Sequence, residues 1–202
     1  LTLTGSRKIM PTGGVVTISK NLLINSGANL DDSTNNTPVN LAGDLTNNGL
    51  FTAGTGLFTL NGSVSKQSIK GIAPVTFRNV TINNPFGVSL DGNIVNTQVN
   101  GILTFLNGKI KTNSNSLILQ STATIAGAGA GKYVFGNLKK FIPANTNSTS
   151  FEIGDSTYYT PVKLDYTGTI SASTGSITAY TLRNDYSPLS GSGIECCGIG
   201  SK

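Results

Sequence analysis

The sequence predicts an all-β protein: a right-handed parallel β-helix, or β-solenoid, followed by a small antiparallel β-sandwich module. One observation is a phrase that occurs twice, because the strand–turn–strand pattern of residues 43–52 returns at 101–112. Another is that short apolar/polar alternations follow one another at fairly even intervals, with Asn/Gly turns between them. Repeated strand–turn units are typical of solenoids, whose neighbouring units stack on a shared core. A meandering β-sandwich is the alternative architecture.

The composition agrees with many short strands joined by turns. Only 11% of the 202 residues are charged, against about 25% in an ordinary soluble domain. The 22 Asn, 26 Thr, 21 Ser and 25 Gly together make up 94 residues. Asn and Gly suit tight turns and Thr suits strands, whereas strong helix formers are scarce.

Eight segments in the first 142 residues resemble short strands. In most of them one parity is apolar, as with Val80 and Ile82 or with Leu103 and Phe105. This is the period of a strand with one buried face. The predicted strands are 15–18, 22–24, 57–60, 77–82, 88–90, 102–105, 117–119 and 123–125.

Turn residues separate these strands. Asn-Gly or Asp-Gly pairs stand at 48–49, 61–62, 91–92 and 107–108, and they tolerate the positive φ that sharp turns require. Asn at such corners also allows stacked coils to align their amide side chains in ladders. Coils of roughly twenty residues would give about six or seven turns in a solenoid domain over residues 1–142.

The pattern changes after Pro143. Longer alternations at 151–153, 161–166 and 176–182 resemble antiparallel strands, and four of the six tyrosines, at 158, 159, 166 and 180, lie between residues 151 and 182. We therefore expect a β-sandwich-like module over residues 147–202. Its strands are too few for a whole sandwich, so it either packs on the end of the solenoid or is incomplete.

Charge and residue types argue against several classes of function. The formal charge is +5 without histidine, and the basic residues are scattered rather than forming the clustered stripe of a nucleic-acid interface. No apolar run has the length of a membrane span. Without histidine, Ser-His-Asp and Cys-His nucleophiles cannot form, and the nine carboxylates show no clustered pair for glycoside hydrolysis. We expect a protein without enzymatic activity, cofactor or metal.

The ends of the chain hold candidates for self-association. Leu1, Thr2, Leu3 and Thr4 alternate like a strand, and an uncovered solenoid edge can add a strand from another copy. Cys196 and Cys197 are neighbours, a spacing at which a disulfide between them is strained. They are either two unpaired thiols or the source of an intermolecular disulfide.

Tyr158 and Tyr159 are candidates for glycan contact, because sugar-binding sites use exposed aromatic rings. One of two adjacent side chains in a strand usually points inward, so packing against the core is the favoured interpretation of this pair.

Several short motifs follow one another in a distinctive order and spacing between Phe77 and Tyr186. These motifs are FRNVTINN at 77–84, GVSL at 87–90, NGKIKT at 107–112, YVFGNL at 133–138, FEIGD at 151–155 and YTPV at 159–162. In their order and spacing, the chain resembles a family of large secreted surface proteins of the Bacteroidetes, which are exported by type IX secretion.

The resemblance implies a β-helix followed by a β-sandwich, location at the cell surface, and a role in adhesion or as a stalk. It carries no catalytic residues. Proteins of that phylum are O-glycosylated at sequence motifs that begin with Asp-Ser or Asp-Thr, and the resemblance therefore implies Ser33 and Ser156 as acceptors. The alternative for both serines is an ordinary turn.

Together these features predict a non-enzymatic extracellular stalk, fibre or adhesin that forms homo-oligomers or polymers. Glycans or proteins of a cell surface are its expected partners, whereas nucleic acid and membrane insertion are not expected. A carbohydrate-binding module for surface polysaccharide is the second hypothesis, and a fragment of a polysaccharide lyase is the third.

Overall fold

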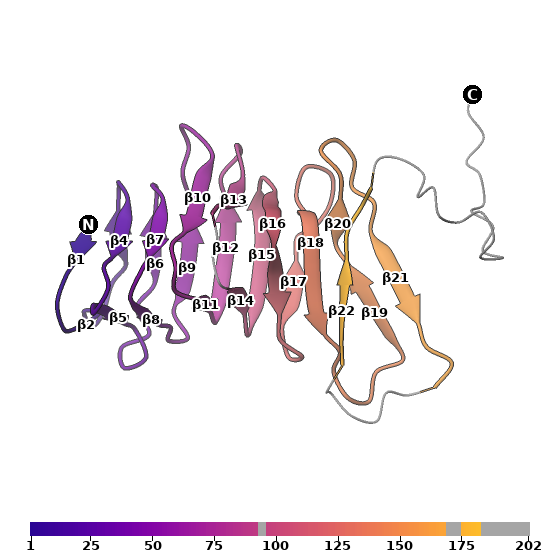
Figure 1. Cartoon of the computed structure of the whole chain (residues 1–202), viewed down its shortest axis with the longest axis horizontal. Coiled ribbons are helices and arrows are strands. Elements are labelled where there is room, and N and C mark those ends of the chain that lie inside the picture. The colour runs from indigo at the N-terminus through magenta and orange to yellow at the C-terminus, as the bar shows by residue number, and fades with distance from the viewer. Residues whose placement is uncertain (93–95, 169–174, 183–202) are drawn as a thin grey trace.

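The computed structural model describes residues 1–92, 96–168 and 175–182. Within these ranges the chain forms 22 strands and no helix. The strands follow one another along the long axis of the molecule from the N-terminal end (Figure 1). The prediction of an all-β protein built on a solenoid is confirmed, with about seven turns.

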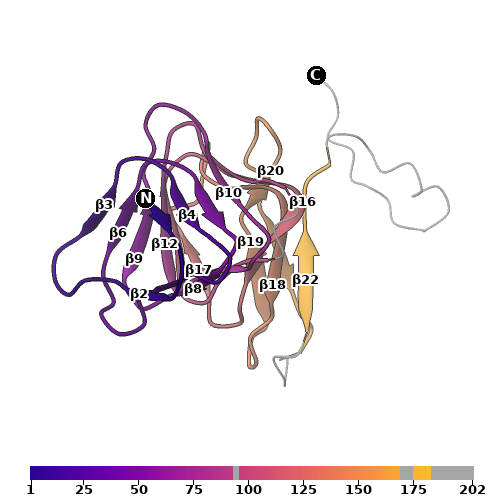
Figure 2. The same ribbon diagram turned by 60° about the vertical axis from the view of Figure 1, so that its left-hand side comes forward.

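Each full turn contributes one strand to each of three walls, which Figure 2 shows partly from the end. Wall A contains β1 (Thr2–Leu3), β4 (Leu22–Ile24), β7 (Leu45–Asn47), β10 (Gln67–Lys70), β13 (Val88–Leu90), the start of β16 (Ile110–Leu119), the start of β18 (Val134–Phe141) and β20 (Ile153–Gly154). Wall B contains β2 (Arg7–Ile9), β5 (Asn29–Asp31), β8 (Leu50–Thr52), β11 (Val75–Phe77), β14 (Thr97–Val99) and the ends of β16 and β18. Wall C contains β3 (Val16–Ile18), β6 (Val39–Leu41), β9 (Leu57–Leu60), β12 (Asn79–Asn83), β15 (Ile102–Asn107) and β17 (Thr124–Ala126).

Neighbouring strands within each wall are parallel, and their register places apolar residues on apolar residues and polar residues on polar ones. In wall C two apolar columns run through the core, because alternate residues of a strand point to the same face. One column is Val39, Phe58, Val80 and Leu103, and the other is Leu41, Leu60, Ile82 and Phe105. All eight side chains are buried. Burial of these columns is the main stabilisation of the coil stack.

The coil length agrees with the prediction of roughly twenty residues. Paired residues of successive coils are 19 positions apart for Val39 and Phe58, and 24 apart for Leu45 and Ile69. The repeated phrase has a different origin from the one expected. Its first copy spans walls A and B, whereas its second spans walls C and A, so the two copies occupy different corners. Their likeness reflects the similarity of the three walls rather than the period of the coil.

One predicted strand is wrong in its extent. Residues 77–82 form two elements, because the chain turns a corner at Arg78 between β11 and β12. Phe77 and Val80 are both buried although they have opposite parity. This change of parity marks the corner at which the chain passes from wall B to wall C.

Amide side chains join successive coils, as the turn residues predicted. Asn107 donates from Nδ2 to Asn83 Oδ1 at 2.7 Å, and Gln120 donates from Nε2 to Gln98 Oε1 at 2.8 Å. More of the amides bond to backbone groups of a neighbouring coil than to one another. Asn79, for example, donates to the Thr55 carbonyl at 3.0 Å and accepts from the Ile102 N–H at 3.1 Å.

After the long strand β18, the described chain forms two antiparallel pairs in addition to β20 of wall A. β19 (Ser148–Phe151) pairs with β21 (Val162–Asp165), and β22 (Ser176–Ala179) pairs with the end of β18. β22 therefore lies beside the last long strand of the solenoid, as both ribbon views show.

Candidate functional site

The carboxylates of the described chain act as acceptors in the scaffold. Asp44 accepts from Lys70 Nζ at 3.0 Å and from the Ser68 N–H at 2.9 Å. The Asp91 carboxylate bridges coils, and burial raises its pKa less than its hydrogen bonds lower it, so that the pKa lies below the ordinary value. The donors to Asp91 are Ser68, Ser89 and Asn113.

Three further acids of the described chain are also held by hydrogen bonds or ion pairs. Lys140 Nζ lies 2.6 Å from Glu152 Oε2, and Lys163 Nζ lies 2.7 Å from Asp165 Oδ1. Asp155 Oδ1 accepts from the backbone N–H groups of Thr157 and Tyr158, at 2.6 and 2.7 Å. In the ranges that the structure describes, no group of three or more Asp, Glu, Cys or His side chains could hold a metal ion.

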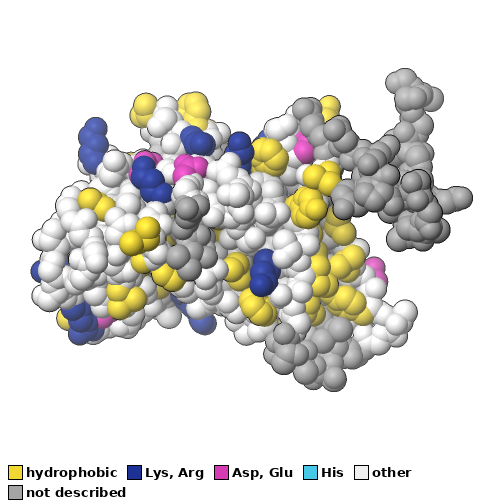
Figure 3. Space-filling model, viewed as in Figure 1, with side chains coloured by type: hydrophobic (Ala, Val, Ile, Leu, Met, Phe, Trp, Pro, Cys, Tyr) yellow, Lys and Arg dark blue, Asp and Glu magenta, His cyan; other side chains and the backbone are white. Residues whose placement is uncertain are grey.

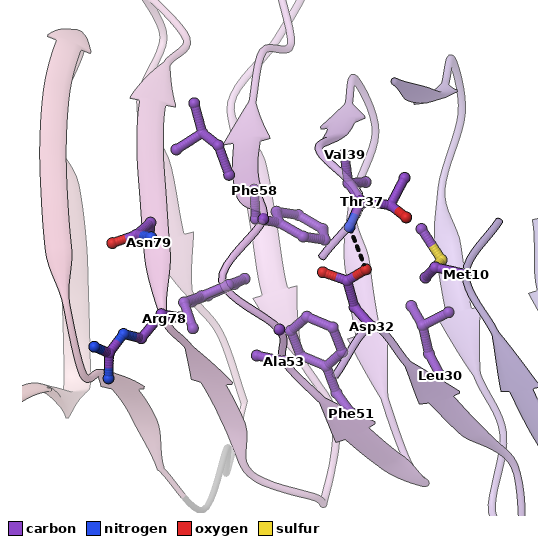
Figure 4. A pocket seen from close by; sticks show the side chains of 14 residues that line it. Met10, Leu30, Asp32, Thr37, Val39, Phe51, Ala53, Phe58, Arg78 and Asn79 are labelled. Carbon is purple, nitrogen blue, oxygen red and sulfur yellow. Dashed lines mark hydrogen bonds between the residues drawn. The ribbon is translucent and has the colours of Figure 1, made fainter. Parts of the chain in front are cut away.

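Asp32 points into an apolar pocket. Figure 4 shows its carboxylate near Phe51 and Phe58, with a hydrogen bond from the Thr37 N–H of 2.6 Å. Burial among these side chains raises the pKa of Asp32. The pocket has a volume of about 10 Å³, which is room for one water molecule at most. The hydrogen bond from Thr37 to Asp32 holds the two ends of the loop 33–37 together. The pocket has no space for a substrate beside the carboxylate.

The N-terminal residues form the first strand of wall A. β1 pairs with β4 only, through the Leu23 N–H to the Leu1 carbonyl at 2.9 Å and the Asn25 N–H to the Leu3 carbonyl at 3.0 Å. Alternate residues of a parallel strand bond to opposite sides, so Thr2 directs its backbone groups away from β4. In the described chain no strand lies on that side of β1, β2 or β3.

The two adjacent tyrosines point in different directions. Tyr158 is 66% exposed. Tyr159 stacks on Tyr133 with ring centroids 5.6 Å apart, and burial together with the charge of Glu152 raises the pKa of Tyr159. Of this pair, Tyr158 alone has a ring free for a sugar.

The two serines proposed as glycosylation acceptors are exposed on loops. Ser33 donates both its N–H and its hydroxyl to Asp31 Oδ1, at 2.8 and 2.7 Å. Ser156 follows the turn-forming Asp155 and accepts from Lys109 Nζ through its carbonyl at 2.8 Å. Both positions are turns, and both leave space for a modification. Cys196 and Cys197 lie outside the described residues.

One surface feature escaped the sequence analysis. The middle residues of the wall C strands, whose side chains face away from the core, stack as a column of hydroxyl and amide groups in which Thr81 is buried: Thr17, Asn40, Thr59, Thr81 and Thr104. A search for Thr-x-Thr within a strand misses it, because stacking repeats the threonine once per coil. Much of the visible surface of the molecule is likewise neutral (Figure 3).

Two of the grooves on the outer surface of the described chain have basic side chains and no carboxylate in their linings. One, of about 530 Å³, lies beside β8 where wall B is interrupted, and Arg78, Thr52 and Thr76 line it. The other, of about 390 Å³, lies at the corner that leads into wall A and is lined by Lys66, Lys109 and Lys111 together with aromatic residues. We call it the lysine groove. Sequence analysis missed it because Lys66 comes from one coil, whereas Lys109 and Lys111 come from another that is far along the sequence.

Comparison with known proteins finds no counterpart for this arrangement. No family model matches the chain, and no curated protein and no solved structure is similar to it. A search of the described residues for a helix long and apolar enough to cross a membrane finds none.

Proposed function

We propose that this chain is a non-enzymatic, extracellular structural module that serves as a shaft in a surface stalk, fibre or adhesin. The observation that supports this most directly is the unbroken stack of core columns from β3 to β15 in wall C. A stack of this kind spaces its two ends apart and presents long surfaces along its sides. We also propose that the solenoid winds in the right-handed sense and that residues 147–202 form a β-sandwich-like module.

The use of the charged side chains supports a structural role over a catalytic one. The carboxylates of wall A bridge adjacent coils, and Asp32 is enclosed in a pocket with no room for a ligand. A glycosidase needs two carboxylates that face one open site, and a lyase needs acids for calcium and a base.

The shaft associates with a second copy at the N-terminal edge of the coil stack. Strand addition supplies main-chain hydrogen bonds along β1, where Thr2 directs its N–H outward. The low density of charge offers little repulsion to such packing.

Sedimentation velocity and negative-stain electron microscopy over a range of concentrations test this association. We expect elongated particles that join end to end as the concentration rises. Thr2→Pro removes the outward N–H and leaves the hydrogen bonds to β4 intact, so this variant should remain monomeric. The control Thr2→Val keeps the N–H and should assemble like the wild type. Elongated monomers at every concentration would contradict the association of copies but would agree with a role as a shaft. Compact particles would contradict the role as a shaft.

The second hypothesis, a module that binds surface polysaccharide, has a separate observation in its favour. Tyr158 offers one exposed ring, and the lysine groove offers a cationic site of ligand size.

A further inference from the structure

The lysine groove concentrates positive charge in one place on a chain with few charges. Its lining contains Lys66, Lys109 and Lys111 and, among the described residues, no Asp or Glu. The salt bridges found in the described chain involve other lysines and Arg7. The ammonium groups of the groove are therefore not neutralised by a carboxylate in contact with them.

The register of wall A creates the hollow. Gln67 pairs with Val88, and Val88 pairs with Ile110, so the residues before them stack in the order Lys66, Gly87, Lys109. The middle position has no side chain, which leaves a gap between two lysines that are two strand spacings apart, about 10 Å.

The backbone requires glycine at this middle position. Gly87 has φ +83° and closes a turn through its N–H to the Asn84 carbonyl at 2.8 Å. A Cβ atom there would also lie 2.8 Å from the Lys109 carbonyl oxygen. The floor of the groove is thus fixed by the fold and does not depend on the rotamers of flexible side chains.

The three lysines have different surroundings. Lys111 Nζ lies 5.6 Å from the ring centroid of Phe135 in the next coil. Lys109 Nζ lies 4.8 Å from the ring centroid of Tyr133 and donates to the Ser156 carbonyl at 2.8 Å. Lys66 is exposed and makes no hydrogen bond within the described chain. Its charge contributes to the lowered pKa of Asp91, whose carboxylate accepts hydrogen bonds from two serines and an asparagine.

Aromatic rings flank the lysines. Phe86, at the tip of the Asn84–Gly87 turn, is 58% exposed, and Phe135 is half-buried on the neighbouring strand. An exposed phenylalanine on a tight turn contributes little to the core. Beside cationic groups it provides the apolar face that a sugar ring covers, since binding sites combine aromatic surface with a few polar groups that fix orientation.

We propose that the lysine groove binds a short segment of an acidic polysaccharide, with its carboxylate or sulfate groups on Lys66 and Lys111 and a sugar face on Phe86. A groove of about 390 Å³ is at the lower end of the range for ligand sites, which suits a few sugar residues of a longer polymer. Nucleic acid is a poorer match, because single-stranded nucleic acid follows an extended basic groove and the positive charge here is confined to one corner. This inference goes beyond the shaft and does not depend on self-association.

Isothermal titration calorimetry on the full chain tests the site with four probes: polygalacturonate, dextran sulfate, unmodified dextran and oligothymidylate. We expect saturable binding of polygalacturonate or dextran sulfate, or of both, that weakens as salt is added, and no binding of dextran. The comparison of the two anionic polymers distinguishes carboxylate from sulfate as the recognised group. Absence of binding to both, or tighter binding of oligothymidylate, would overturn the proposal.

Matched variants separate the groove from net charge. Lys66→Gln with Lys111→Gln should weaken binding at least tenfold, whereas Lys8→Gln with Lys20→Gln removes the same charge from exposed positions outside the groove and should change it less than twofold. Phe86→Ala should weaken binding several-fold, and Phe86→Tyr should retain it. Equal losses in the two double variants would show attraction by overall charge and would refute the site.

Discussion

Asp31 and Asp32 are adjacent in the sequence, and both are buried, yet their carboxylates lie on opposite sides of the same coil. Asp31 forms an ion pair with Arg7 on the outside and accepts two hydrogen bonds from Ser33. Asp32 points inward to an apolar pocket. The surroundings move their pKa values in opposite directions: the Ser33 hydroxyl, assisted by the Ser33 N–H and Arg7, lowers the pKa of Asp31 against the effect of burial, whereas burial raises that of Asp32.

The wild type should lose stability as the pH rises, and Asp32→Asn should abolish this loss. Because the pKa of Asp32 is raised in the folded state, the folded chain holds this proton more tightly than the unfolded chain. The free energy of unfolding therefore falls as the pH rises from about 4 through the folded pKa. Urea denaturation between pH 4 and 7 should show the variant gaining on the wild type across this range. A constant difference would contradict the assignment.

Asp31→Asn should show the opposite dependence. The pKa of Asp31 is lowered in the folded state, so its stabilisation is present above the ordinary value of about 3.8 and is lost as the pH falls through the folded pKa. The variant should be less stable than the wild type at pH 7, and the difference should shrink below pH 4. Asp165→Asn, at a carboxylate that is 66% exposed, serves as the control and should change little at either pH.

Gly108→Ala should cost more than Gly27→Ala, although both glycines have positive φ, +82° and +78°. A Cβ atom at Gly108 would lie 1.9 Å from the Asn84 carbonyl oxygen of the preceding coil, whereas at Gly27 it would meet nothing within 4 Å. Gly27→Ala should cost about 1–2 kcal/mol for the backbone conformation alone. Gly108→Ala should exceed it by about 2 kcal/mol or more, since two coils must move apart. Similar midpoints of urea denaturation for the two variants would mean that the coils are not in close contact there.

Phe77→Ala should destabilise the solenoid by about 3–5 kcal/mol, the usual cost of removing a buried phenylalanine. Phe77 is 2% exposed, and its ring centroid lies 5.8 Å from that of Phe51 and 5.2 Å from that of Phe58. Val64→Ala, at a side chain that is 87% exposed, should change stability by less than about 0.5 kcal/mol. Thermal and urea denaturation measure both, and a small effect at Phe77 would contradict the aromatic cluster.

Gln67→Leu should be strongly destabilising although leucine has a similar size. The buried amide of Gln67 donates to the carbonyls of Leu41 and Gly43 at 2.9 and 2.7 Å, and accepts from the Gly62 N–H at 2.7 Å. Leucine would leave these groups without partners, at about 1–3 kcal/mol for each buried group. Gln98→Leu, whose amide is half-buried and bonds to Gln120, should cost less than about 1 kcal/mol. Equal effects on the urea midpoint would count against the role of Gln67.

The solenoid could be predicted because its walls carry strict alternation. Pairs such as Val80 and Ile82 give the buried face of a strand directly, and the Asn-Gly turns give the corners. The division into three walls could not be read from alternation alone, since strands of all three walls look alike. The change of parity between Phe77 and Val80 carried that information, and the prediction of one strand over 77–82 overlooked it.

The candidate groove could not be predicted from the basic residues as they occur in the sequence. Lys66 and Lys109 are 43 positions apart and appear scattered. Their proximity depends on the register that stacks both on Gly87. Register is set by packing between coils, so it becomes visible only when residues about one coil apart are compared.

The parallel ladders of the three walls have a mechanical consequence. The hydrogen bonds that join successive coils run along the long axis of the molecule, because the strands lie across it (Figure 1). Tension between the two ends would therefore open the bonds of one coil before those of the next, and the chain would peel apart turn by turn. Bending stretches the ladders on the outer side of the bend, so the same hydrogen bonds between coils oppose both kinds of load.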